Sequence, residues 1–95
     1  MSNVKQLYER LRALPWPVLA RSVGDFALYE TLLTGCADRF ARGGLVDTSK
    51  IPAPDEETIA RVNLLRKKNA LTQEERAFLE YFELLEEIRS ALRGV

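Results

Sequence analysis

The segment from Gly43 to Lys50 contains the residue types that bind phosphate groups: two glycines, two hydroxyl side chains and a lysine. A P-loop needs Gly-x-x-x-x-Gly-Lys-Ser/Thr between a strand and a helix, because its backbone N–H groups and its lysine must converge on the phosphates. Here the two glycines are adjacent and end a helical pattern. The spacing therefore favours a helix cap followed by a turn over a phosphate site.

Nucleophilic and metal chemistry is restricted because the chain has no histidine and a single cysteine, Cys36. The usual general base, the usual partner of a serine or cysteine nucleophile and the commonest zinc ligand are therefore missing. Cys36 falls on an apolar helical stripe, which favours a small core residue over a reactive thiol. We therefore predict that the protein is not an enzyme, and we expect no cofactor and no metal. The alternative is an enzyme whose catalytic groups are carboxylates, tyrosine or lysine in a cleft.

Glu80, Glu83 and Glu87 share one face of a predicted helix, as carboxylate ligands of a metal could. Di-iron bundles add a Glu-x-x-His pair and bury their ligands, whereas these glutamates lie opposite the apolar side of their helix. A solvated acidic face is the favoured interpretation. The alternatives are a contact with the basic surface of a partner and a loose divalent-cation site.

The basic cluster of the chain could contact a nucleic-acid backbone. Three of its four members lie in the last turn of a predicted helix, where the helix dipole favours cations, and Glu74 and Glu75 follow where it favours anions. Helix-end electrostatics is therefore the favoured reading, and nucleic-acid binding is the alternative. The cluster consists of Arg61, Arg66, Lys67 and Lys68.

Composition predicts one ordinary globular domain spanning residues 1–95. Apolar residues make up 46% of the chain and charged residues 29%, and 14 basic side chains balance 14 acidic ones. A neutral chain has no overall attraction to nucleic acid or to an anionic membrane. The start of the chain has no apolar signal core, and no apolar run approaches the ~20 residues of a membrane span. We expect a cytoplasmic protein without membrane contact.

Apolar residues recur with helical spacing along most of the chain, and no segment alternates with a period of two. The sequence therefore predicts an all-α fold, a small bundle of about four helices with a C-terminal antiparallel helical hairpin. The predicted helices span about 3–14, 22–42, 54–69 and 72–93, with a crossover loop at 43–53.

Capping residues mark the ends of these helices. Ser2 is placed to cap the first helix, and the spacing of Ser22 and Asp25 suggests an approximate capping box for the second. Thr72 and Glu75 form the clearer Thr-x-x-Glu capping box for the last helix. The hairpin turn is thus the best-marked feature of the sequence.

Several large apolar residues fall outside the stripe that each helix needs for a core. The last helix has an apolar arc near 180°, which a central position in the bundle or a contact with another chain would use. Because a 95-residue monomer has limited means to cover such residues, we predict a protein–protein interaction module or small adaptor, with a homodimer as its simplest form. The predicted partner-binding residues are Leu28, Leu32, Leu64, Leu79 and Phe82.

Overall fold

The computed structural model describes residues 3–94, which form four α-helices and two short 3₁₀ helices. No strand occurs among these residues, so the prediction of a small all-α bundle is confirmed. No helix in this range is long and apolar enough to cross a bilayer. The elements are α1 (Val4–Ala13), η1 (Val18–Ser22), α2 (Phe26–Ala41), η2 (Thr48–Lys50), α3 (Glu56–Arg66) and α4 (Gln73–Arg93).

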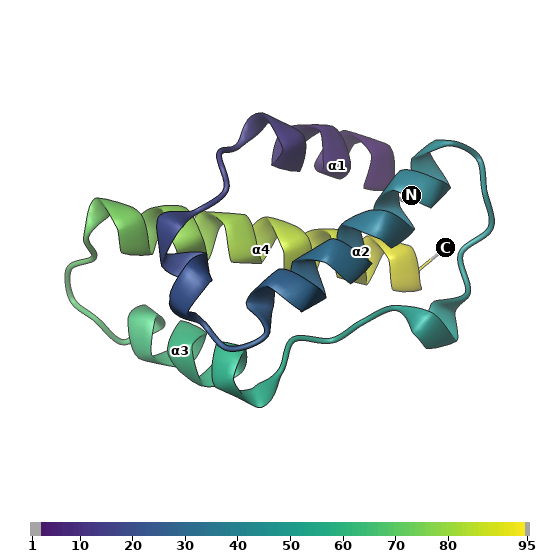
Figure 1. Ribbon diagram of the computed structural model, residues 1–95. Coiled ribbons are helices and arrows are strands. Elements are labelled where there is room, and N and C mark those ends of the chain that lie inside the picture. The colour runs from purple at the N-terminus through teal and green to yellow at the C-terminus, as the bar shows by residue number, and fades with distance from the viewer. Residues whose placement is uncertain (1–2, 95) are drawn as a thin grey trace.

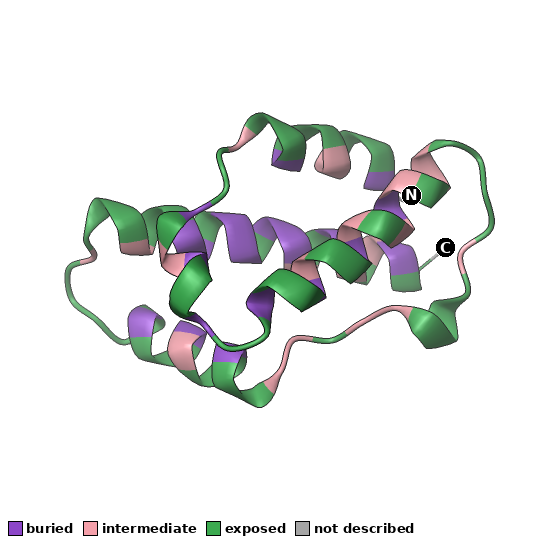
Figure 2. Cartoon of the chain, in the orientation of Figure 1, coloured by how far each residue is buried: buried purple, intermediate pink, exposed green. Residues whose placement is uncertain are grey.

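Helix α4 is the centre of the bundle. Helices α1, α2 and α3 and the short helix η1 all pack against it, and in Figure 1 it lies between α1 and α3 with α2 crossing in front. Figure 2 shows an almost continuous buried band along α4. The wide apolar arc of this helix is therefore covered by the chain itself.

This packing corrects part of the predicted binding surface. Leu79 and Phe82 were expected to remain uncovered, but they are only 9% and 4% exposed. Both belong to the hydrophobic core cluster that residues 3–94 form. Their sequence pattern reflects the central position of α4 and not a surface for a partner.

Aromatic side chains join α2 to α4 in this core. The ring of Phe26 lies 5.0 Å from the ring of Phe78, centroid to centroid, and about 6.3 Å from the rings of Tyr29 and Tyr81. Edge and tilted contacts of this kind add to the free energy gained by burying the rings. The inner face of α2 is thereby fixed against α4.

The α3–α4 hairpin forms as the capping residues indicate. The Thr72 hydroxyl accepts a hydrogen bond from the Glu75 N–H, and the Glu75 carboxylate accepts one from the Thr72 N–H, which completes the predicted capping box. Across the turn, Lys68 Nζ lies 2.6 Å from the same Glu75 carboxylate. This hydrogen bond from Lys68, together with the bond from the Thr72 N–H, lowers the pKa of Glu75.

The second predicted helix begins later than expected. Residues 18–22 form the separate 3₁₀ helix η1, and Gly24, with a φ of +35°, turns the chain before α2 begins at Phe26. The approximate capping box is absent, because Ser22 Oγ donates to the Leu19 carbonyl and Asp25 makes no side-chain cap. Ser2, the predicted cap of the first helix, lies outside the described residues.

The crossover loop returns the chain from the far end of α2 to the start of α3. In Figure 1 it passes η2 and then runs back beneath α2. Arg89 Nε on α4 donates to the Pro52 carbonyl at 2.9 Å and holds the returning segment against the bundle. Because the loop runs back along α2 instead of making a tight turn, its residues lie beside that helix.

Candidate functional site

The outer side of α2 is apolar and exposed. Leu28 and Leu32 lie one turn apart and are 58% and 51% exposed, while Phe26, Tyr29 and Leu33 on the opposite side are buried. Two leucines left uncovered on one helix face are a feature of protein-binding surfaces. We call this side the outer α2 face.

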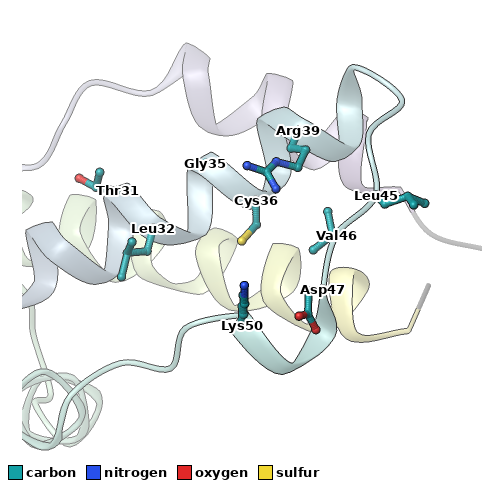
Figure 3. A pocket seen from close by; sticks show the side chains of 9 residues that line it. All are labelled: Thr31, Leu32, Gly35, Cys36, Arg39, Leu45, Val46, Asp47 and Lys50. Atoms are coloured by element: carbon teal, nitrogen blue, oxygen red, sulfur yellow. The ribbon is translucent and has the colours of Figure 1, made fainter.

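A groove adjoins the outer α2 face, between the C-terminal half of α2 and the crossover loop. We call it the α2–loop groove; its volume is about 530 Å³. Leu32, Gly35 and Cys36 line its helix side, and Val46 lies on its loop side. Figure 3 shows Arg39 and Lys50 on opposite sides of Cys36, with their cationic ends extending toward it.

The end of α2 explains why Arg39 lies along this groove. Gly43 has a φ of +86°, and its N–H donates to the Phe40 carbonyl, while the Gly44 N–H donates to the Arg39 carbonyl at 2.9 Å. This pair of bonds is the Schellman cap that glycine favours. A Cβ at Gly44 would lie 2.7 Å from Arg39 Cγ, so the glycine gives the arginine stem room beside the loop. The Gly-Gly pair is therefore a helix cap.

The groove carries positive charge. Among residues 3–94, neither Arg39 nor Lys50 forms an ion pair. Asp47 also lines the groove, but its carboxylate accepts hydrogen bonds from the Ser49 N–H and hydroxyl, which lower its pKa. Two cations thus face the groove beside one carboxylate that is already hydrogen-bonded within the loop.

Two tyrosine–glutamate pairs set the orientation of α2 against α4. Tyr29 on α2 donates to Glu86 on α4 at 2.5 Å, and Tyr81 on α4 donates to Glu30 on α2 at 2.8 Å. Burial raises the pKa of Tyr29 and of Tyr81 well above the usual tyrosine value, and the hydrogen bonds to glutamate raise both further. Because the pairs cross in opposite directions, they restrict rotation of α2 and keep Leu28 and Leu32 outside.

The remaining predicted residues have separate locations. Leu64 is 63% exposed, but it belongs to α3 and not to α2. In the basic cluster, Arg66 lies 3.7 Å from Glu83, and Lys68 pairs with Glu75. The structure therefore uses half of the basic cluster to join α3 to α4.

Cys36 is half-buried and lines the α2–loop groove. In the described part of the chain, no group of three or more cysteine and carboxylate side chains could hold a metal ion.

Trp16 is 39% exposed. The centroid of its ring lies 6.4 Å from the centroid of the Phe26 ring, so Trp16 packs on the end of the core with one side open.

Sequence reasoning missed the groove. Gly35 and Arg39 attract no attention in the sequence, because a glycine within a helix and an isolated surface cation are common, and Lys50 was considered only as part of a phosphate loop. Only the return of the crossover loop places Lys50 and Val46 beside α2. Leu45 on this loop, at 91% exposed, carries the one signal that could have been read: a leucine between a helix cap and a turn.

Comparisons with protein-family models, with curated proteins and with solved structures found no match to this chain.

Proposed function

We propose that the protein is a non-enzymatic protein-binding module and that the outer α2 face, with the adjoining groove, is its binding surface. The observation that carries the proposal is the exposure of Leu28 and Leu32 after the bundle has buried every other large apolar side chain of α2 except the half-buried Phe40. A partner is either another protein or a second copy of the chain.

Energetic arguments support a surface that includes the groove. Burying one leucine contributes about 1.5–3 kcal/mol, whereas association costs about 4–15 kcal/mol in lost translational and rotational freedom. Because Leu28, Leu32 and Leu45 are 58%, 51% and 91% exposed, burying them offsets only the lower part of that cost. Additional contacts in the groove and its charges are then needed for measurable affinity.

Selection of random displayed peptides against the full-length protein tests this function. Enriched peptides are retested against variants Leu28→Glu and Leu32→Glu, and against Leu64→Glu as a matched control on α3. All three changes lie at exposed positions, so the bundle is expected to stay folded. The proposal predicts that the first two variants lose binding and that the control retains it.

The module would be contradicted if no selected peptide depended on Leu28 or Leu32 and the protein also remained monomeric in sedimentation. Binding that is lost only in Leu64→Glu would move the surface to α3.

Nucleic-acid binding by the basic cluster has less support. Arg66 and Lys68 are already near glutamates of α4, and those carboxylates would repel a phosphate backbone. Electrophoretic shift at low salt with DNA and RNA is the direct check, and a complex weakened by Lys67→Ala would revive this alternative.

A further inference from the structure

Four positions of α2 and the residue directly before it form one stripe. Their spacing alternates between three and four residues, as in a coiled-coil seam, and at 100° per residue they span about 80° of the helix. The stripe has an acidic residue at its N-terminal end, two leucines, a glycine and a basic residue at its C-terminal end. The positions are Asp25, Leu28, Leu32, Gly35 and Arg39.

We propose that the occupant of the outer α2 face is α2 of a second copy, packed antiparallel about a two-fold axis at Leu32. In this arrangement Leu32 meets Leu32 of the second copy. Leu28 enters the other copy's groove beside Gly35 and Cys36, and Asp25 lies opposite the other copy's Arg39. A two-fold interface requires such self-complementarity, since each contact must occur twice. The inference rests on the proposed function and names its partner.

The shape of the stripe fits this packing. An added Cβ at Gly35 would meet nothing within 4 Å, so the surface is open at this point. Leu28 is the more exposed of the two leucines in the stripe and lies on the other side of Leu32 from Gly35. Antiparallel packing brings the projecting side chain to the open position at both ends of the seam. A glycine in a helix–helix seam also permits the close approach of two backbones, within the usual interaxial distance of ~8–10 Å.

The charges also fit this direction. Asp25 precedes α2, and Asp55 and Glu57 extend to the same end, where a Cβ on Gly24 would lie 2.7 and 2.9 Å from their carboxylate oxygens. Arg39 and Lys50 occupy the other end, beside the groove. Antiparallel packing places the acidic end of each copy against the basic end of the other, whereas parallel packing would oppose like charges.

Sedimentation equilibrium over a concentration series is the first test. The wild-type protein is expected to form a dimer, and Leu32→Glu is expected to abolish it because it places two carboxylates on the axis. Leu64→Glu is the matched control and is expected to leave the dimer intact. A wild-type protein that stays monomeric at high concentration overturns the inference, as does a dimer that Leu32→Glu leaves unchanged.

Charge reversal tests the direction of the packing. Asp25→Arg and Arg39→Asp are each expected to weaken the dimer about tenfold, since each puts like charges at both ends of the seam. The double variant, Asp25→Arg with Arg39→Asp, restores opposite charges and is expected to regain dimerisation. Asp25 makes no side-chain cap, and circular dichroism verifies that each variant is folded. A double variant no better than the single ones contradicts antiparallel packing.

The native cysteine provides an independent test. In the variant Leu28→Cys, mild oxidation is expected to link position 28 of one copy to Cys36 of the other, as identified by mass spectrometry. The same two positions within one copy are about 12 Å apart along the helix, beyond the ~7 Å between Cα atoms that a disulfide allows. A dominant link between the two copies of position 28 would indicate parallel packing and overturn the proposed direction.

These outcomes separate the inference from the proposed function. If the protein is a monomer that binds selected peptides through Leu28 and Leu32, the homodimer is overturned and the protein-binding function is retained. A monomer that binds no peptide through these leucines removes both.

Discussion

Helices α2 and α4 both carry more apolar surface than a single docking contact needs, yet the bundle treats them differently. On α4, Leu79 and Phe82 are 9% and 4% exposed, whereas on α2, Leu28 and Leu32 are 58% and 51% exposed. Helix α4 is central and contacts every other α-helix, while α2 packs on α1, α4 and η1 and leaves its outer face exposed. The width of an apolar arc therefore predicts how much contact a helix makes, but not whether the same chain provides it.

The polar groups repeat this contrast. On the side of α2 that faces α4, tyrosine hydroxyls and glutamates satisfy one another. Beside the outer face, Arg39 and Lys50 form no ion pair among the described residues. The inner side is complete within the monomer, and the outer side is suited to a further contact.

The largest expected difference between the two helices is in core truncation. Phe82→Ala is expected to lower the free energy of unfolding by about 3–5 kcal/mol, because it leaves a cavity in the core. Leu32→Ala is expected to change it by less than ~0.5 kcal/mol at a concentration where the protein is monomeric. Urea denaturation followed by circular dichroism measures both. Equal losses for the two variants would contradict the contrast between α4 and α2.

Removing a hydrogen bond between α2 and α4 is expected to have an intermediate effect on the free energy of unfolding. Tyr29→Phe removes the hydrogen bond to Glu86 and is expected to cost about 1.5 kcal/mol, the lower end for a bond to a charged group, because Glu86 is partly open to water. Thermal or urea unfolding at neutral pH measures this loss. A variant as stable as the wild type would show that the other contacts of α2 hold it without this hydrogen bond.

The same pair predicts a dependence on alkaline pH. The folded state raises the pKa of Tyr29 above its ordinary value of 10.0, so it retains a proton that the unfolded state releases. The stabilisation is complete below pH 10 and falls as pH rises beyond it. Tyr81 contributes in the same direction. Tyr29→Phe is therefore expected to show a shallower loss of stability at alkaline pH than the wild type.

A smaller effect is expected at the start of α4. Thr72→Ala removes the side-chain half of the capping box and is expected to cost about 1 kcal/mol. Thr31→Ala, at an exposed position inside α2, is the matched control and is expected to be neutral or slightly stabilising, because alanine is the better helix former. Similar losses in the two variants would indicate a general effect of threonine removal and not the cap.

A smaller effect, which stabilises the fold, is expected at Gly35, where folding stability and self-association are expected to respond in opposite directions. Gly35→Ala is expected to raise the free energy of unfolding by about 0.5–1 kcal/mol, because alanine is less flexible and the added methyl group meets nothing. The same methyl group obstructs the proposed seam, so self-association is expected to weaken. Denaturation measures the stability of the variant, and sedimentation of the same sample measures its self-association. A variant that gains both stability and association would argue against the seam.

Helix caps and helix ends could be predicted from the sequence because they depend on residues that are close together in the chain. Thr72 and Glu75 cap a helix through backbone groups three residues apart, and Gly43 ends one through its own φ, so both could be predicted without a fold. The all-α class followed from helical periodicity in the same way. The start of α2 was less predictable, since Ser22 and Asp25 have the spacing of a cap but Gly24 bends the chain between them.

The tertiary structure alone decided which apolar residues remain outside and what lies beside them. From the sequence, Leu28 and Phe82 were both predicted to lie outside the core. Phe82 is buried only because α4 occupies the centre of the bundle. Likewise, Lys50 reaches the side of α2 only because the crossover loop returns along it. Periodicity describes one helix at a time, whereas burial and grooves depend on contacts between segments far apart in the chain, and those contacts are formed only when the whole bundle packs.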